Sequence, residues 1–237
     1  MTTQAERASG SRAPLTRERV LRAAIALADE SGLGAVTMRR LAEALRAEAM
    51  SLYYHVSNKD DVLDGMVDLI AREINEASAT GTESKDWKSA VRHRILGARR
   101  VLLRHRWAPG LLATRTTASP AIIAHHDALI GLMHRGGLSY DLIHHGMHAL
   151  GSRSMGFVQE LFDPGSGPVS DEAIAALSAD FPNLAGMLGE VAHDDPESTL
   201  GWCDDQTEFE FGLDLILEGL DQKSTDAKRK AGKRVNR

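Results

Sequence analysis

Helical periodicity runs through almost the whole chain of 237 residues, and it restricts the fold more than any other feature. Apolar residues recur three and four positions apart in nearly every segment between turn markers, and no segment shows a convincing strand alternation. Aromatic residues make up only 5% of the chain, which favours helices over a β-sandwich. We therefore predict an all-α protein, divided into helices by its Gly, Pro and polar runs.

Three short helices are predicted in the first sixty residues. Thr16 and Thr37 are suited to cap the first two, because a hydroxyl oxygen accepts a hydrogen bond from a free backbone N–H. Gly32 and Gly34 end the first helix. A third helix is expected at about 49–56, separated from the second by a tight turn. Such a plan is typical of a helix-turn-helix DNA-binding domain.

The remaining helices follow from caps and turn markers in the same way. Ser57-Asn58-Lys59-Asp60 predicts a capping box with Ser57 as the N-cap of a helix that reaches about residue 76. We therefore expect a disordered arm at 1–14, a DNA-binding domain at 15–76, a helical body at 77–222 and a disordered basic tail at 223–237. Within the body, helices are predicted at about 87–105, 120–135, 140–162, 171–192 (one or two) and 204–220.

Charge is distributed unevenly along the chain. The net charge is −5, but residues 1–60 carry +2, residues 61–221 carry −13 and residues 222–237 carry +6. An acidic total alone argues against nucleic acid as a partner, yet a basic head allows a positive face toward DNA. The single cysteine, Cys203, excludes an intramolecular disulfide and fits a reducing cytoplasm. No apolar run is long enough for a membrane span, so we predict a cytoplasmic protein.

The third helix carries the residue types that a major-groove helix requires. Its outward side chains must form hydrogen bonds, which Ser51, Tyr53, Tyr54 and His55 can do, whereas Leu52 and Val56 are spaced to face inward. Adjacent residues of a helix cannot face one side, so core packing is the weaker interpretation of the two tyrosines.

The segment LAEALRAEAMSLYYHVSNKDDVL (41–63) resembles the DNA-binding signature of the tetracycline-repressor (TetR) family. That family usually has Gly in the turn where this chain has Arg46, so Arg46 must either adopt a left-handed conformation or belong to a differently shaped turn. In either case, Arg46 can add a phosphate contact. The resemblance implies base contacts from Arg39, Glu48, Ala49, Met50 and Ser51, and phosphate contacts from Thr37, Tyr53, Tyr54, His55 and Lys59.

Two apolar seams in the body predict helix packing of the four-helix-bundle kind, because their residues are spaced alternately four and three apart. Either the seams pack inside one subunit, or they form a dimer interface. EFEFGLDLILEGLD (208–221) resembles the end of TetR-type C-terminal domains, which implies a homodimer. The expected interface residues are Ile143, Met147, Leu150, Phe157, Phe209, Leu213, Ile216 and Leu220.

The same resemblance implies a pocket for a small-molecule inducer in the body. LLRHRWAPGLLATR (102–115) is similar to the segment that holds magnesium-tetracycline in the tetracycline-responsive members. Leu111 and Asn75 stand where ligand-contacting histidines fall in those members, so magnesium-tetracycline is not the expected inducer. The candidate pocket residues, each of which also fits a core position, are Asn75, Trp107, Leu111, Thr114, His126 and Met133.

Other functional classes receive less support from the sequence. His144 and His148 share a helix face at a spacing that binds zinc, but no third ligand completes the set, so we predict no metal and no cofactor. No nucleophile elbow or phosphate-binding glycine loop is present, and we predict no enzyme. The predicted function is a ligand-responsive repressor of a palindromic operator in double-stranded DNA. An architectural DNA binder without ligand control, or a helical enzyme that uses the histidines, remains as the alternative.

Overall fold

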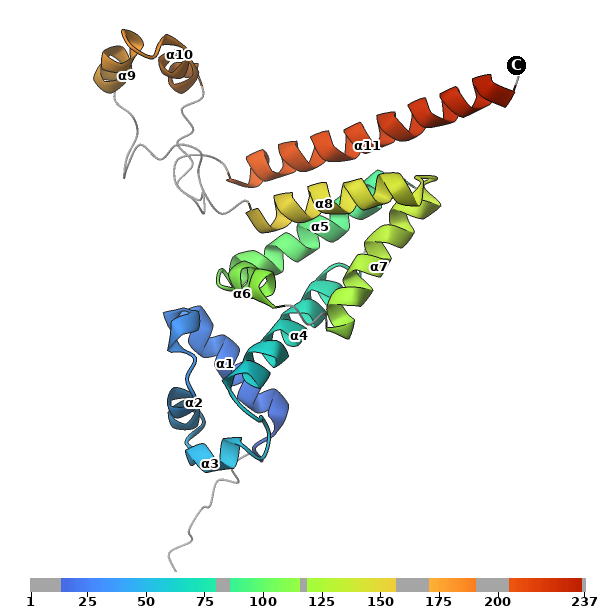
Figure 1. The fold of residues 1–237 in the computed structure, drawn as a ribbon. Coiled ribbons are helices and arrows are strands. Elements are labelled where there is room, and N and C mark those ends of the chain that lie inside the picture. The colour runs from blue at the N-terminus through green and yellow to red at the C-terminus, as the bar shows by residue number, and fades with distance from the viewer. Residues whose placement is uncertain (1–13, 80–85, 116–118, 157–170, 191–204, 236–237) are drawn as a thin grey trace, which may run out of the picture. The chain divides into compact units, whose positions relative to one another are not determined.

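The computed structural model describes residues 14–79, 86–115, 119–156, 171–190 and 205–235. All regular structure in these residues is helical, which confirms the predicted all-α class (Figure 1). No helix among them is both long and apolar enough to cross a membrane. The helices are α1 (Arg17–Ser31), the 3-10 turn η1 (Leu33–Ala35), α2 (Met38–Leu45), α3 (Ala49–Leu52), α4 (Lys59–Ala77), α5 (Trp87–Arg104), α6 (Ala108–Thr114), α7 (Pro120–Arg135), α8 (Tyr140–Gly156), α9 (Asp171–Ser178), α10 (Pro182–Glu190) and α11 (Asp205–Val235).

The chain forms two compact units, each with its own hydrophobic core. One unit joins the residues up to 76 with residues 100–125, and the other joins 77–99 with the residues from 126 onward. The predicted linear division at residue 76 did not anticipate that 100–125 belongs to the first unit. Leu111 is buried in the first unit's core and Trp107 packs against it, which is the physical reason for this assignment.

In the first unit, α1 to α4 surround a core that includes Leu41, Leu52 and Met66, all fully buried. The predicted caps of α1 and α2 are confirmed, since the Thr16 and Thr37 hydroxyl oxygens each accept a backbone N–H at 3.2 Å. Gly32 follows α1 with φ of 77°, a conformation that glycine adopts without strain.

The cap of α4 lies one residue later than the sequence predicted. Asn58, not Ser57, acts as the N-cap, because its Oδ1 accepts the Asp61 backbone N–H at 2.8 Å. In return, Asp61 Oδ2 accepts the Ser57 backbone N–H at 2.8 Å. Asp61 therefore bonds two different residues at the start of α4, Asn58 through its backbone N–H and Ser57 through its carboxylate, and the predicted capping box between Ser57 and Asp60 is not the one observed.

In the second unit, α5, α7, α8 and α11 share a core in which α8 and α11 pack together. Most of the predicted dimer residues are buried here, inside a single subunit, so the alternative that the seams pack internally applies to them. They cannot contact a partner directly, because their own subunit already covers them. Fully buried or nearly so are Ile143, Leu150, Phe209, Leu213 and Leu220, whereas Met147 and Ile216 are half-buried and Phe157 lies outside the described residues.

The predicted disordered tail is helical. α11 continues for 31 residues and ends at Val235, well past the predicted end near residue 220. Ser224 is buried, and its hydroxyl donates a hydrogen bond to the Gly137 carbonyl at 3.4 Å, so packing extends the helix beyond the seam. Lysine and arginine are good helix formers and favour the negative end of the helix dipole, which the composition argument for disorder overlooked. Residues 1–13 of the predicted arm lie outside the described residues.

Candidate nucleic-acid interface

α3 separates outward from inward side chains as a DNA-reading helix requires. Leu52 is fully buried and Val56 nearly so, which anchors the segment on the core. Met50 is 71% exposed and Tyr54 is 88% exposed. Tyr53 is also exposed, and the remaining predicted base-reading residues of this segment, Glu48, Ala49 and Ser51, are exposed or half-buried. This local pattern agrees with the orientation expected from the sequence.

Arg46 forms the turn between α2 and α3 in the left-handed conformation, with φ of 51° and ψ of 44°. It is the only non-glycine residue with positive φ in the described part of the chain. Its backbone N–H caps α2 by donating to the carbonyls of Ala42 and Glu43. The first of the two predicted possibilities is therefore the one observed: arginine accepts the strain that glycine avoids.

The predicted phosphate-contacting residues flank α3. Thr37 and Lys59 stand at the starts of α2 and α4, respectively, and both are exposed. Arg39 is also exposed, and its Nε donates to Glu43 Oε1 at 2.9 Å within α2. Arg39 is the predicted base contact in this group, and because its pair with Glu43 is exposed, separating the pair to reach a base edge costs little free energy. His55 is half-buried at the end of the α3 segment.

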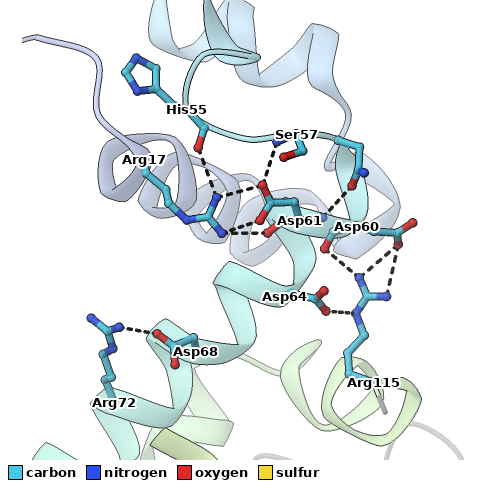
Figure 2. Close-up of polar contacts among 10 residues, drawn as sticks. Arg17, His55, Ser57, Asp60, Asp61, Asp64, Asp68, Arg72 and Arg115 are labelled. Atoms are coloured by element: carbon cyan, nitrogen blue, oxygen red, sulfur yellow. Dashed lines mark hydrogen bonds and ion pairs between the residues drawn. The ribbon is translucent and has the colours of Figure 1, made fainter. Parts of the chain in front are cut away.

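One contact network that the sequence did not predict holds this end of the reading segment (Figure 2). Arg17, the first residue of α1, donates to the His55 carbonyl at 3.2 Å and to both carboxylate oxygens of Asp61, at 2.5 and 3.0 Å. The hydrogen bond from Arg17 lowers the pKa of Asp61 from 3.8 to about 2, aided by the Ser57 backbone N–H. The same hydrogen bond raises the pKa of Arg17. Arg17 thus fixes the carbonyl end of the segment that presents Tyr53 and Tyr54.

A second arginine bridges to α4 from the residue after α6. Arg115 Nη2 donates to the Asp60 backbone carbonyl at 3.0 Å, and Arg115 Nε lies 2.9 Å from Asp64 Oδ1 (Figure 2). Its side chain is largely covered. The bridge connects the start of α4, beside the reading segment, to the segment that the sequence assigns to ligand sensing.

His105, which is itself buried, is the centre of a further polar cluster within the first unit. Its Nδ1 lies 2.8 Å from Asp29 Oδ1 and its Nε2 lies 3.3 Å from Glu73 Oε2. Asp29 also accepts the Trp107 indole N–H at 2.6 Å, and Arg104 pairs with Glu73. The cluster links α1, α4 and the α5–α6 junction. Sequence periodicity gave no signal for it, since its members come from three separate segments.

The predicted ligand residues are dispersed in the structure. Leu111 is buried in the core of the first unit and Met133 in that of the second. Asn75 donates to the Ala121 carbonyl at 2.8 Å, Thr114 donates to the Leu111 carbonyl at 2.9 Å, and His126 is exposed. The ligand role of these residues stays a prediction.

A groove of about 1250 Å³ lies in the first unit along α1 and α4, with Arg104 and His105 at its wall. None of the predicted ligand residues lines it. Most of the charged side chains in it belong to ion pairs, such as Arg22 with Glu18 and Arg72 with Asp68. Apolar side chains such as Leu21 and Ile25 complete the lining.

The histidines of α8 form ring contacts. His144 and His148 have ring centroids 4.7 Å apart, and His144 and His145 have centroids 5.9 Å apart. No group of three or more metal-ligating residues occurs in the described ranges. The pair alone supplies two ligands, fewer than a structural metal site uses.

The fold and the interface define a class of protein: a helical transcription regulator with an N-terminal helix-turn-helix. Two family models match the chain. One, described as bacterial regulatory proteins of the tetR family, matches residues 20–66, and the other, described as the tetracyclin repressor-like C-terminal domain, matches residues 80–224. The chain belongs to the TetR family of transcriptional regulators.

Individual relatives agree with this assignment. An HTH-type transcriptional regulator of Saccharopolyspora erythraea is 34% identical over 221 residues, covering 91% of this chain and 88% of that protein. The class C tetracycline repressor protein of Escherichia coli is 26% identical over 88% of this chain and 91% of its own length. ActR of Streptomyces coelicolor, solved in complex with actinorhodin, superposes with a TM-score of 0.70 at 29% identity, covering 90% of this chain and 99% of ActR. The predicted function, a ligand-responsive DNA-binding regulator, is confirmed at the level of the family.

Proposed function

We propose that this chain is a repressor that binds a palindromic operator as a homodimer and leaves it when a small molecule binds. The observation that carries the proposal is the opposite burial of neighbouring residues in α3. Leu52 and Val56 hold the segment on the core, while Met50 and Tyr54 face solvent. Two large apolar or aromatic side chains that point outward from so short a segment contribute nothing to the core of a single subunit. They are suited to contact the major groove of duplex DNA.

We assign base reading to the exposed side chains of α2 and α3 and phosphate contacts to the residues around them. Arg39 and Glu48 provide hydrogen bonding, and Ala49 and Met50 provide apolar contact of the kind made with a thymine methyl. The surrounding polar and charged side chains fix the register of the helix on the duplex. They are Thr37, Arg46, Tyr53, Tyr54, His55 and Lys59, whereas Ser51 is assigned to base reading beside Arg39 and Glu48.

Two copies are needed because one short helix makes few base contacts. The buried seam residues cannot supply the dimer surface, so we assign it to the outward face of α11, where Phe211 is 62% and Leu215 is 59% exposed. These two residues lie four apart and therefore share one side of the helix. Large apolar residues kept outward in this way are typical of a surface that a partner covers. The twofold axis of such a dimer matches a palindromic site.

For the inducer, we propose an organic small molecule other than magnesium-tetracycline. Leu111 cannot ligate a metal and is buried in the core, and the Asn75 amide is engaged by the Ala121 carbonyl. ActR, which was solved with actinorhodin, shows that a protein of this architecture holds an organic ligand. Inducer binding changes operator affinity only if the ligand prefers one of two conformations of the dimer. We place the protein with its DNA partner in the cytoplasm.

Selection of bound duplexes from a random pool tests the proposal. We expect a palindrome whose half-sites are about 34–36 Å apart, the spacing that two reading heads of a dimer impose. Binding without a preferred sequence would overturn the regulator and favour an architectural DNA binder. Screening small molecules against the selected operator then tests ligand release. An operator complex that no ligand dissociates would remove the sensing part of the proposal alone.

A further inference from the structure

The last turns of α11 carry a positive charge to which the proposed function assigns no role. Residues 223–235, the basic end of α11, contain six of the seven Lys and Arg residues found in 222–237, against one acidic residue. Lys228, Arg229, Lys230 and Lys233 are all exposed. Among the described residues, the ion pair found here is a marginal one, with Arg229 Nη1 4.0 Å from Asp226 Oδ1.

The first half of the same helix is acidic, and its carboxylates have ion-pair partners. Its carboxylates face basic residues of α5: Lys88 Nζ lies 2.7 Å from Glu218 Oε1, and Arg92 Nε lies 2.8 Å from Asp214 Oδ1. Arg92 also pairs with Glu210. These contacts explain the acidic half as a docking surface for α5. They leave the basic end without a counterpart of that kind among the described residues of its own subunit.

Packing ends where the basic end begins to project. Ser224 is buried against the α7–α8 turn, and the Lys228 ammonium lies beside Gly137 in that turn. Beyond this point the described side chains are exposed, and Figure 1 shows the helix (red) continuing past the turn to the C-terminal end. The helix therefore holds several cations in a fixed arrangement away from the core.

We propose that the basic end of α11 binds the phosphate backbone of duplex DNA, as a contact separate from the helix-turn-helix. The proposal rests on the proposed function in one respect, which is that DNA is the partner of this protein. One feature selects a duplex over an anionic membrane: the projecting residues from 225 to 233 include no large apolar side chain to insert between lipids, as an amphipathic membrane helix requires. Arg229 and Lys233 lie four apart and Lys230 and Lys233 three apart, so these cations share one side of the helix and can contact one phosphate backbone together.

The test compares the full chain with a variant in which Lys228, Arg229, Lys230 and Lys233 are all replaced by Gln. All four side chains are exposed, so the substitutions leave the core intact. Each protein is titrated with the minimal selected operator and with the same operator extended by about 20 base pairs (two helical turns) on each side. A charge-keeping variant, Lys228→Arg with Lys230→Arg and Lys233→Arg, serves as the matched control.

We expect the Gln variant to bind the minimal operator like the parent but the long duplex at least tenfold more weakly at low salt. The slope of its salt dependence on the long duplex should fall by about 0.9 for each phosphate that the variant no longer neutralises, and the Arg variant should retain the parent's values. Equal affinities of parent and Gln variant for the long duplex would overturn the proposal. So would an equal weakening on both duplexes, which indicates a long-range charge effect.

Vesicles of phosphatidylserine and phosphatidylcholine provide the membrane arm. Vesicle binding by the parent that the Gln variant loses, with unchanged DNA binding, would assign the basic end to a membrane and overturn the proposal. If the parent recognises no operator, the proposed function fails first, and a long duplex of arbitrary sequence still tests the basic end by the same comparison.

Discussion

The guanidinium of Arg17 and the carboxylate of Asp61 form a two-pronged ion pair, although 44 residues separate them in the chain. Arg17 begins α1 and Asp61 lies in the first turn of α4, so the pair connects the starts of these two helices. Because Arg17 also donates to the His55 carbonyl, the pair fixes the backbone that follows the reading helix (Figure 2). We therefore expect operator recognition to depend on two residues that need not contact DNA.

The pair makes the stability of the protein sensitive to acid. Arg17 lowers the pKa of Asp61 from 3.8 to about 2, so the folded state binds a proton less readily than the unfolded state does. The resulting stabilisation is complete above pH 3.8 and is lost as the pH falls toward 2. Because the pair is partly exposed, we expect about 1 kcal/mol from it.

Urea unfolding of the parent and of Asp61→Asn at several pH values checks this expectation. The variant should be less stable than the parent near neutral pH and should approach it in acid. Asp180→Asn removes an exposed carboxylate between α9 and α10 and serves as the control. A constant difference between Asp61→Asn and the parent down to pH 2 would contradict the assigned cause of the shift.

The phosphate-contacting residues around α3 allow a direct test of the interface. Tyr53→Ala and Lys59→Ala each remove an exposed side chain, so the fold should persist while operator affinity falls about tenfold. Lys59→Ala should also reduce the salt dependence by about 0.9, the value for one phosphate contact. Gel-shift titration at several salt concentrations measures both quantities. Tyr140→Ala, an exposed tyrosine of the second unit, should bind like the parent. Unchanged affinity of both interface variants would remove α3 from the DNA contact.

Contacts between residues that are close together in the sequence were predicted, whereas contacts between residues far apart in the sequence were not. The caps at Thr16 and Thr37 and the opposed faces of α3 follow from a few neighbouring residues, and these predictions hold. The Arg17–Asp61 pair and the His105 cluster join segments far apart in the chain, and no local sequence pattern predicts them.

Two further predictions were made from one local feature without its surroundings. The lysine-rich composition of 223–237 predicted disorder, but Ser224 packs on the α7–α8 turn and α11 runs on to Val235. The seam spacing in α8 and α11 correctly predicted packed helices. Spacing alone cannot tell a neighbouring helix of the same subunit from one of a partner, and residues such as Phe209 proved to be covered within the subunit.

The N-cap of α4 gives a prediction that separates the observed cap from the one expected from sequence. Asn58→Ala removes the acceptor of the Asp61 backbone N–H and should lower the free energy of unfolding by about 1 kcal/mol. Ser57→Ala leaves that hydrogen bond in place and should cost clearly less. Thermal and urea unfolding of the two variants side by side decides between them. A larger effect of Ser57→Ala would restore Ser57 as the cap.

The left-handed turn at Arg46 predicts opposite effects on stability and on DNA binding. Glycine at this position removes a strain of about 1–2 kcal/mol and adds an unfolded-state entropy cost of about 0.5–1 kcal/mol, so Arg46→Gly should stabilise the fold by about 0.5–1 kcal/mol. Removal of the guanidinium should weaken operator binding and lower its salt dependence by about 0.9. Arg46→Ala is the matched control, because it lacks the charge and keeps the strain. A stability gain in the alanine variant would show that strain is not the cause.

The outward face of α11 predicts how the dimer can be broken without unfolding the subunit. Phe211→Glu places a charge where we expect apolar contact with a partner, and burying an unpaired carboxylate costs more free energy than the apolar contact contributes. Since Phe211 is exposed in the single subunit, its replacement should leave the core of the subunit intact, as measured by its helical content. We expect sedimentation equilibrium to report a monomer. We expect the affinity for a palindromic operator, measured by gel shift, to fall more than tenfold, because one reading head acts alone.

Ile123→Glu, a similar change at an exposed residue of α7, should leave both the dimer and operator binding intact. A dimeric Phe211→Glu variant with parental affinity would move the interface to another face of the second unit.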